Sequence, residues 1–506
     1  MRKNFILVTF LFLFINILGF ANEKSKDIDV ISILDKEREA SYFILNFSSF
    51  TESKEIMDYI NTNINKKGSA TFIFNTKGIF DENGKAIYLE ENTDFDENNS
   101  YKISIKYKIE SLKNKSGIYI DSNISSQNEK NQYKYSIEFN KKFIKYRGYT
   151  GNPYNTLLDD YEPEAVVEEL DKFFDKIKNE LSPFIKKVTE KKKSEKELAI
   201  TEKFKNMNFN IQKQEEFSKY LLDIIKFSFE KGVLKESEHP FTTEFSNKDV
   251  RITTHYYENN LLSSIYSTIH EGGHALYEQH IGDEITDTVL GGGVSMGIHE
   301  SQSRIYENMF GRSMEFIEFI YPKMDEIFNF SENGIDKKEL YKLANEVERQ
   351  FIRTESDELT YPIHILIRYE LEKEIFGNLD EETDVDVLAV KWADKYEEYL
   401  GIRPTTYTEG ILQDVHWAEG LFGYFPSYAL GTAYAAQIYD AINKKVNIKE
   451  EMKKGEFNQI NEILKENIHK YGKMKTPKEI IKDMTGEDFD SQYYIDYLKE
   501  KFSEIY

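Results

Sequence analysis

The chain has 506 residues, enough for several domains with a large packed core. Its 66 Lys and Arg stand against 89 Asp and Glu, giving a formal net charge of -23, and such a field repels phosphate backbones and anionic lipid headgroups. Nucleic acid is therefore not expected as a partner. The 40% hydrophobic and 14% aromatic content indicates a globular protein. There is no cysteine, which excludes thiol nucleophiles and disulfides, so any metal must be held by histidines and carboxylates.

The N-terminus has the pattern of a secretory signal peptide. Arg2 and Lys3 precede an apolar run from Phe5 to Phe20, and Gly19 and Ala21 form a small-x-small cleavage pattern. The run is shorter than the roughly 20 residues that span a bilayer. We predict that residues 1–21 are removed and that the exported protein, periplasmic or extracellular, has no integral membrane span. If the segment is not cleaved, it tethers the protein to the membrane.

Residues 22–147 read as a β-rich segment. Tyr101–Ile109 alternates polar and apolar side chains, and Asn83-Gly84 is a turn signal. We predict a small antiparallel, sandwich-like accessory domain over residues 22–147. Its expected strands lie within residues 42–47, 71–74, 86–89, 101–109, 117–120 and 133–139.

From Pro163 the apolar period becomes helical, as in Phe217, Leu221, Ile224 and Ile225 on one face. Long helices are expected from there to the C-terminus. The fold class predicted for residues 148–506 is therefore mainly α.

The sequence His270-Glu271-Gly272-Gly273-His274 is an HExxH motif in a predicted helix from about Leu261 to His280. Four residues along a helix return to nearly the same direction and rise about 6 Å, so both imidazoles can bind one ion. Glu271 stands on the neighbouring edge, where its carboxylate can accept a proton from water instead of binding the metal. The two glycines cost roughly 1 kcal/mol each in helix propensity, which suggests the close approach of a substrate or a neighbouring helix. The competing interpretation is a surface helix with two unrelated histidines.

The third metal ligand has several candidates. His280 follows His270 at the metzincin spacing, but Tyr277 stands where that motif needs glycine. On a continuing helix His280 would lie about 15 Å along the axis, out of reach. Two imidazoles and one carboxylate form the ligand set of hydrolytic zinc sites. Glu300, in a helix expected after Gly291-Gly292-Gly293, is favoured weakly over His299, Glu278 and Glu307.

Six stretches from about Gly148 to the C-terminus resemble the carboxypeptidase Taq family of zinc metallocarboxypeptidases. The resemblance implies an elongated helical body with a deep groove at the metal, and peptide substrates with a free C-terminus. It also implies that His270, His274 and Glu300 bind Zn²⁺, with Co²⁺ as a substitute, and that Glu271 is the general base or acid. The stretches are Asn152–Pro163, His239–Phe241, Asp249–Thr253, the HExxH with its partner His299–Gln302, Ile352–Asp357 and Gly410–Trp417.

A carboxypeptidase must hold the terminal carboxylate of its substrate. A guanidinium does this bidentately, so Arg251 and Arg353 are the candidates, with structural ion pairing as the alternative for each. His239, which precedes Pro240, either lines the groove or caps a helix.

The oxyanion formed during peptide hydrolysis needs hydrogen-bond donors besides the metal. His416, Tyr424 and Tyr428 can supply them. Core packing explains the two tyrosines almost as well.

Family members usually begin with further helices and lack an export signal, whereas here the β-rich segment stands in that place. The sequence therefore predicts an exported zinc carboxypeptidase of broad specificity that removes residues singly and can form a homodimer. One competing function is a catalytically impaired, peptide-binding relative, against which the intact Glu271 argues. The other is a zinc endopeptidase or dipeptidyl carboxypeptidase, which would not need the carboxylate-binding arginines.

Overall fold

The computed structural model describes residues 29–35, 40–46, 71–72, 79–80, 85–95, 101–111 and 126–506. The chain divides into two compact units, Met1–Asn128 and Glu129–Tyr506. The predicted signal peptide and the strand expected over residues 117–120 lie outside the described residues. Within the described ranges, no helix has both the length and the apolar character needed to cross a membrane.

The described strands of the first unit form two small sheets. In one, β1 pairs antiparallel with β2, and β2 pairs parallel with β3. In the other, β5 pairs antiparallel with both β4 and β6. The sandwich-like domain over residues 22–147 stays a prediction. The strands are β1 (Asp29–Asp35), β2 (Ala40–Asn46), β3 (Thr71–Phe72), β4 (Ile79–Phe80), β5 (Lys85–Phe95) and β6 (Tyr101–Ser111).

The strand predicted over residues 133–139 is wrong, because these residues lie within helix α3 (Ser126–Arg147). Tyr133, Ile137 and Ile144 are buried at helical spacing along it. The Tyr133 hydroxyl donates to the carbonyl oxygen of Ile411 at 2.6 Å. The buried side of α3 thus belongs to the core of the helical unit.

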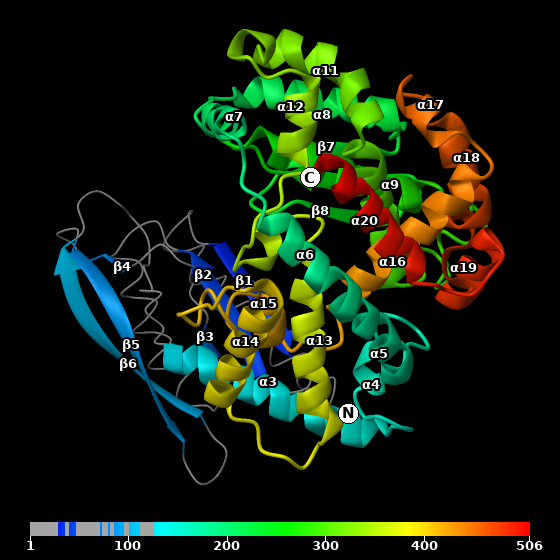
Figure 1. Ribbon diagram of the computed structural model, residues 1–506. Coiled ribbons are helices and arrows are strands. Elements are labelled where there is room, and N and C mark those ends of the chain that lie inside the picture. Colours follow the sequence, from blue (N-terminus) through cyan, green and yellow to red (C-terminus); the bar gives the residue numbers. More distant parts are fainter. Residues whose placement is uncertain are drawn as a thin grey trace. The chain divides into compact units, whose positions relative to one another are not determined.

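The second unit is mainly helical, as predicted (Figure 1). Its α-helices are α4 (Asn155–Leu158), α5 (Val167–Lys176), α6 (Ser182–Thr189), α7 (Glu195–Lys205), α8 (Ile211–Ile225), α9 (Leu261–Gln279), α10 (Met296–Arg304), α11 (Met314–Phe328), α12 (Lys337–Ala344), α13 (Tyr361–Gly377), α14 (Val385–Leu400), α15 (Val415–Ala418), α16 (Pro426–Asn443), α17 (Ile448–Met452), α18 (Asn458–Asn467), α19 (Pro477–Thr485) and α20 (Gln492–Ile505). The π-helices are η2 (Ile177–Leu181) and η3 (Ile305–Gly311), and the 3₁₀ turns are η4 (Ser331–Asn333), η5 (Arg353–Glu355) and η6 (His469–Met474).

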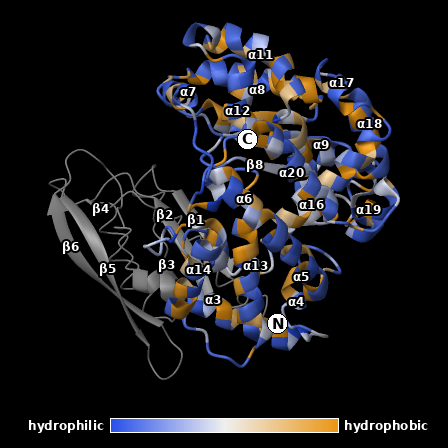
Figure 2. Cartoon of the chain, in the orientation of Figure 1, coloured by the Kyte–Doolittle hydropathy of each residue, from blue (hydrophilic) through white to orange (hydrophobic). Residues whose placement is uncertain are grey.

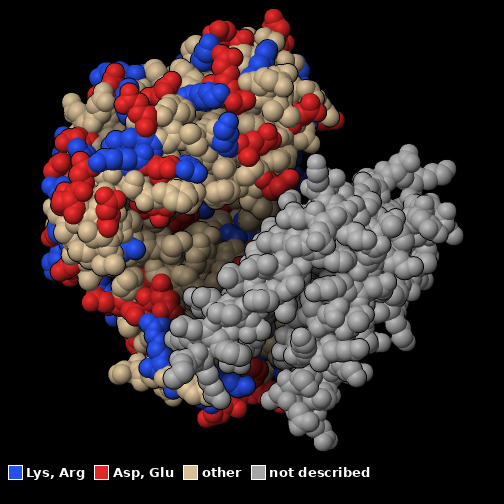
Figure 3. Space-filling view, turned by 180° about the vertical axis from the view of Figure 1, so that it is seen from behind, with Lys and Arg blue, Asp and Glu red and all other residues tan. Residues whose placement is uncertain are grey.

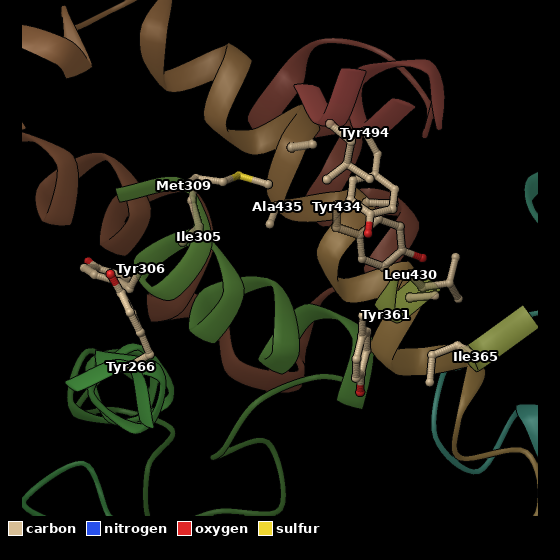
Figure 4. Packing of buried hydrophobic residues seen from close by; sticks show 14 of the residues in the cluster. Tyr266, Ile305, Tyr306, Met309, Tyr361, Ile365, Leu430, Tyr434, Ala435 and Tyr494 are labelled. Atoms are coloured by element: carbon tan, nitrogen blue, oxygen red, sulfur yellow. The ribbon is translucent and has the colours of Figure 1, made fainter. Parts of the chain in front are cut away.

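Amphipathic helices build the core of this unit. Many of them are hydrophobic on one side and hydrophilic on the other (Figure 2). In α8 the predicted face is buried, with Phe217, Leu221 and Ile225 at most 1% exposed. Leu430 and Tyr434 of α16 lie among aromatic and aliphatic side chains of the core (Figure 4).

A three-stranded sheet within the helical unit was not predicted. Its order is β7 (Gly232–Glu236), β9 (Asp249–Thr254), β8 (Phe241–Ser246). Central β9 pairs parallel with β7 and antiparallel with β8, and its Val250 and Ile252 are buried. Helix α9 packs against both β8 and β9. Among the described strands β8 pairs with β9 alone, so its other edge has no strand partner in that part of the chain.

On the visible part of the face shown in Figure 3, charged side chains of both signs are interspersed. On the face shown in that figure, the acidic residues are spread between basic ones and not gathered in one patch. The same face is hollowed in its middle.

Candidate metal centre

Helix α9 carries the HExxH motif and places its two histidines on one side. The helix starts after Asn260, whose side chain accepts a hydrogen bond from the backbone N–H of Ser263. The imidazole rings of His270 and His274, one helical turn apart, have centroids 4.9 Å from each other. Two nitrogen ligands can therefore reach a common ion.

Gly272 and Gly273 let two neighbouring helices approach α9. A Cβ on Gly272 would lie 2.5 Å from Cδ1 of Ile225 in α8, and a Cβ on Gly273 would lie 2.5 Å from the carbonyl oxygen of Gln302 in α10. Both distances are too short for side-chain carbon atoms. The glycines thus have a packing function, and the one at 273 brings α10 close enough to contribute to the site.

Helix α10 delivers the third candidate ligand, Glu300. The Ser295 side chain caps the helix by accepting from the backbone N–H of Ile298 at 3.0 Å. Oε2 of Glu300 lies 3.7 Å from Nε2 of His270 and 3.5 Å from Nε2 of His274. One ligand atom from each of these three residues lies within 4.8 Å of the others. Two imidazoles and one carboxylate fit a hydrolytic metal site with a fourth position left for water.

The other candidate third ligands, Glu307, His299 and Glu278, form hydrogen bonds around this cluster. Oε2 of Glu307 lies 2.8 Å from Nδ1 of His270. Nδ1 of His299 lies 2.6 Å from Nδ1 of His274, and Nε2 of His299 lies 2.8 Å from the Glu278 carboxylate. Because a carboxylate needs a donor, His299 donates from Nε2 and accepts from His274 at Nδ1. Both ligand histidines thus turn Nε2 toward the ion site.

His280 does not contribute to the cluster. It follows the last residue of α9, and its Nδ1 lies 3.0 Å from Nδ1 of buried His469. The histidine at the metzincin spacing is therefore structural here.

Arg304 neutralises the two buried glutamates. Its Nε donates to Oε1 of Glu300 at 2.6 Å, and its Nη1 donates to Oε2 of Glu307 at 3.0 Å. Burial alone would raise the pKa of Glu300, but Arg304 and the two histidines outweigh it and hold that pKa well below its usual range. Glu300 is therefore charged at neutral pH, which is the state in which a carboxylate can bind a cation.

The two histidines respond differently to the same environment. Burial lowers the pKa of His274 to about 3. Burial also acts to lower the pKa of His270, but the carboxylates of Glu300 and Glu307 outweigh it, and the net pKa is raised. His274 is thus neutral before any cation binds, whereas at His270 a cation competes with a proton that is held more tightly than on an unperturbed imidazole.

Glu271 lies beside the cluster and is 6% exposed. The Thr242 hydroxyl donates to its Oε2 at 2.6 Å, which fixes the carboxylate. Burial raises the pKa of Glu271. A raised pKa brings a carboxylate closer to the neutral range, where a proton acceptor is most effective.

These residues open into one cavity of about 570 Å³. Strand β8 forms part of its wall, through Phe241, Thr242, Glu244, Phe245 and Ser246. The cavity wall is chemically mixed, with acidic, basic, hydroxyl and apolar side chains among its lining residues. The remaining lining residues are Asn247, His270, Glu271, His274, Glu278, Thr286, Thr288, Gly291, Gly292, Gly293, Met296, His299, Glu300, Tyr424, Ser427, Tyr428 and Lys473.

Comparison with known protein families shows to which family the chain belongs. The model of the carboxypeptidase Taq (M32) metallopeptidase family matches residues 82–502. The chain belongs to this family. The match starts before Gly148, where the sequence resemblance was placed, so the M32 body includes helix α3.

Relatives and solved structures agree with the M32 assignment. Carboxypeptidase 1 of Bacillus subtilis is 46% identical over 371 residues, 73% of this chain and 72% of that protein. Thermostable carboxypeptidase 1 of Pyrococcus furiosus is 42% identical over 370 residues, 72% of each chain. The structure of Pyrococcus furiosus carboxypeptidase matches with a TM-score of 0.70 at 39% identity, covering 74% of each chain. The BsuCP crystal structure matches with a TM-score of 0.69 at 44% identity, covering 76% of this chain and 75% of the other. The protein is therefore a metallocarboxypeptidase, a peptide hydrolase that uses a divalent metal.

Of the three predicted oxyanion donors, two line the cavity and the third contacts one of them. Tyr424 and Tyr428 line the cavity, and the Tyr428 hydroxyl donates to that of Tyr424 at 3.2 Å. His416 is not among the described lining residues, but its ring stacks on Tyr424 with centroids 5.2 Å apart. Burial lowers the pKa of His416 to about 4, so its imidazole is neutral at neutral pH.

Arg353 is held in an ion pair behind the cavity. It is 6% exposed, and its Nε and Nη2 donate to Oδ1 of Asp414 at 3.1 and 2.9 Å. Arg368 donates to the other oxygen of the same carboxylate from Nε at 2.8 Å. Arg353 is not among the described lining residues, and its guanidinium carbon lies 5.3 Å from the ring centroid of Tyr428, which lines the cavity. The structure thus favours the ion-pairing alternative for this residue.

Arg251 lies at the surface beside the cavity. Its side chain is 50% exposed and pairs bidentately with Asp249, with both N···O distances at 2.8 Å. The guanidinium carbon lies 4.7 Å from the ring centroid of Phe245, which lines the cavity. His239 is exposed and is not among the described lining residues, so the structure does not bring it to the metal cluster.

Sequence reasoning missed Arg304 and Thr242. Arg304 could have been found, since it follows Glu300 by one helical turn and precedes Glu307 by nearly one. Thr242 has no local signal, because only the pairing of β8 with β9 and the packing on α9 bring it to Glu271.

Proposed function

We propose that this M32 metallocarboxypeptidase is an exported zinc enzyme of broad specificity in which Glu271 is the general base. One observation carries the proposal: His270, His274 and Glu300 converge within 4.8 Å in a cavity that Glu271 also lines. The donor set fits Zn²⁺, which prefers imidazole and carboxylate ligands in a four-coordinate site. When bound there, the ion would act as a Lewis acid on the scissile carbonyl and lower the pKa of water.

Glu271 would take the proton from the attacking water and return it to the leaving amine. Its carboxylate is fixed by Thr242 and is not one of the three clustered ligands. A general base of this kind has to face the same space as the metal, and Glu271 lines the cavity together with His270, His274 and Glu300.

Tyr424 would donate a hydrogen bond to the developing oxyanion. Since Tyr428 donates to Tyr424, the Tyr424 hydroxyl hydrogen is left for the substrate. Burial raises the pKa of Tyr424, so the hydroxyl stays protonated at neutral pH. His416, which stacks on Tyr424, would orient that ring from outside the described lining.

The edge of β8 that faces away from β9 would align the peptide. A strand with unpaired N–H and C=O groups can bind an extended chain by main-chain hydrogen bonds, which are independent of side-chain identity. Five of the six residues of β8 line the cavity. This arrangement, together with the mixed chemistry of the cavity wall, supports broad specificity.

The terminal carboxylate would be bound near the cavity mouth by Arg251. This residue is exposed and lies against Phe245 of the lining. Both arginines are already ion-paired, Arg251 with Asp249 and Arg353 with Asp414. We prefer Arg251 because its side chain is 50% exposed, whereas that of buried Arg353 is 7% exposed, and we assign Arg353 a supporting role beside Tyr428.

Export rests on the N-terminal pattern of Arg2, Lys3 and the apolar run to Phe20. Mass analysis of the intact protein from the producing cells would locate the mature start, which we expect after Ala21. A chain that keeps residues 1–21 would contradict cleavage. The homodimer stays a prediction.

The enzymatic proposal is tested with one peptide in two forms. Metal-loaded protein is incubated with the free-acid peptide and with its C-terminal amide, and products are followed by mass spectrometry. We expect stepwise loss of single residues from the acid form only. Internal cleavage of both forms would favour an endopeptidase, release of dipeptides a dipeptidyl carboxypeptidase, and binding without cleavage an impaired relative.

A further inference from the structure

Glu162 is buried against the first turn of α10, the helix that delivers Glu300. The residue is 4% exposed, and its Oε2 accepts a hydrogen bond from the backbone N–H of Gly297 at 3.0 Å. A Cβ on Gly297 would lie 2.4 Å from the same oxygen, so only glycine allows this approach. None of the steps of peptide hydrolysis described above uses this carboxylate.

Three successive backbone N–H groups at the start of α10 each donate a hydrogen bond to a different acceptor. The N–H of Met296 donates to the carbonyl oxygen of Tyr161 at 2.9 Å, that of Gly297 to Glu162, and that of Ile298 to the side chain of Ser295. The segment Tyr161–Glu162 therefore fixes where α10 begins, in place of water.

Glu162 also connects α10 to α16. Its Oε1 accepts from the hydroxyl of Tyr434, which projects from α16 into the core (Figure 4). Three residues earlier on α16, a Cβ on Gly431 would lie 2.6 Å from Cβ of Glu300. Helix α10 is thus packed against α16 on the side of the metal ligand and anchored by Glu162 at its start.

We propose that Glu162 is a positioning residue that sets the place of Glu300 through helix α10. It contacts neither the metal cluster nor the cavity, and acts on the ligand only through the helix start and through Tyr434. The inference rests on the proposed metal site. Because Glu300 has to reach two histidines on another helix, a shift or rotation at the start of α10 displaces the carboxylate directly.

The test compares Glu162→Leu, Glu162→Gln and a matched control, Glu372→Leu. Glu372 is equally buried and accepts from a backbone N–H, that of Gly423 at 2.6 Å, and from a tyrosine hydroxyl, that of Tyr154 at 2.6 Å. Glu372 lies on α13, and neither of these two partners belongs to α10. Zn²⁺ affinity is measured by competition with a chromogenic chelator, and ligand geometry by the visible spectrum of the Co²⁺ form.

We expect Glu162→Leu to weaken Zn²⁺ binding roughly tenfold or more, as removal of outer partners of a metal site does, and to alter the Co²⁺ spectrum. Glu162→Gln should restore both, because its amide oxygen can accept from Gly297 while its NH₂ group donates to Tyr434. Glu372→Leu should lower the melting temperature to a similar extent and leave Zn²⁺ affinity and the Co²⁺ spectrum unchanged.

Equal Zn²⁺ affinity in Glu162→Leu and wild type, or equal weakening in Glu372→Leu, would overturn the inference while the proposed function stands. A wild type that binds no ion would overturn both. If Glu162→Leu does not fold, Tyr434→Phe takes its place. That variant loses one hydrogen bond to the carboxylate and should weaken Zn²⁺ binding roughly threefold, and unchanged affinity would contradict the proposal.

Discussion

Glu307 holds His270 through a hydrogen bond of 2.8 Å between Oε2 and Nδ1. The same carboxylate accepts from Arg304 and, at 3.0 Å, from Arg312. Since η3 continues directly from α10, Glu300 and Glu307 approach His270 from one continuous stretch of chain. The metal ligand and its outer partner are therefore positioned together.

Glu307→Gln should weaken metal binding. The amide cannot carry the charge that favours the Nδ1–H tautomer of His270, and loss of an outer partner typically costs 10- to 100-fold in metal affinity. Chelator competition measures the change. Glu339→Gln is the control, because Glu339 is also buried and ion-paired, with Lys196, but lines no part of the cavity. Wild-type affinity in Glu307→Gln would show that Nδ1 needs no carboxylate.

Glu271→Gln should abolish most turnover and leave the metal in place. General-base catalysis contributes roughly 10²- to 10⁴-fold, so kcat should fall by that order. Elemental analysis should find the same metal content as in wild type. Glu244→Gln, which removes another carboxylate of the cavity wall, should cause a much smaller loss. Persistent turnover in Glu271→Gln would assign the base to another group.

Arg251→Gln should raise KM for free-acid peptides and leave binding of the amide form unchanged. A charged hydrogen bond contributes about 1.5–3 kcal/mol, which corresponds to roughly tenfold or more in affinity. The control is Arg403→Gln, since Arg403 is exposed and also pairs with carboxylates, those of Asp394 and Glu397, but does not line the cavity. A parallel rise in KM for both peptide forms would remove the carboxylate role from Arg251.

Asp414→Asn should destabilise the fold at neutral pH and make it less sensitive to acid. Burial alone would raise the pKa of Asp414, but Arg368 and Arg353 outweigh it and hold that pKa well below its usual range. A depressed carboxylate pKa contributes stability above the unfolded value of about 3.9, and this is lost as pH falls through the folded pKa. At pH 7 the variant leaves two buried guanidiniums without their carboxylate, at a cost of about 3–5 kcal/mol.

Urea unfolding at pH 7, 5 and 3 measures this effect. The difference in free energy of unfolding between wild type and Asp414→Asn should be largest at pH 7 and should narrow below about pH 4. A constant difference across the series would mean that Asp414 does not titrate against the two arginines.

The metal cluster could be predicted from sequence because helix geometry fixes the spacing of its first two ligands. His270 and His274 needed only the repeat of an α-helix. Glu300 needed the family resemblance, since several acidic and histidine residues were within plausible reach. Those others proved to be hydrogen-bond partners, a distinction that depends on distances and not on residue type.

The sheet and the first helix of the body were harder to predict, for different reasons. Strands β7, β8 and β9 have only five or six residues each, too few to show a period among helices. Over residues 133–139, local alternation suggested a strand, but burial of Ile144 shows the helical period only in a longer window. The choice between Arg251 and Arg353 could not be made from sequence, because an exposed and a buried, ion-paired arginine are identical there.

The two glycines inside the HExxH motif limit how this enzyme can be engineered for heat resistance. Replacing helical glycine with alanine is a standard way to stabilise a protein, worth up to about 1 kcal/mol at compatible sites. At positions 272 and 273 the added methyl would lie 2.5 Å from Ile225 and from the backbone of Gln302. At 273 the change would push α10, the helix of Glu300, away from α9, because the contact is with backbone, whereas at 272 it would force side chains of α8 to move. Thermostable designs should therefore leave position 273 untouched and gain little at 272.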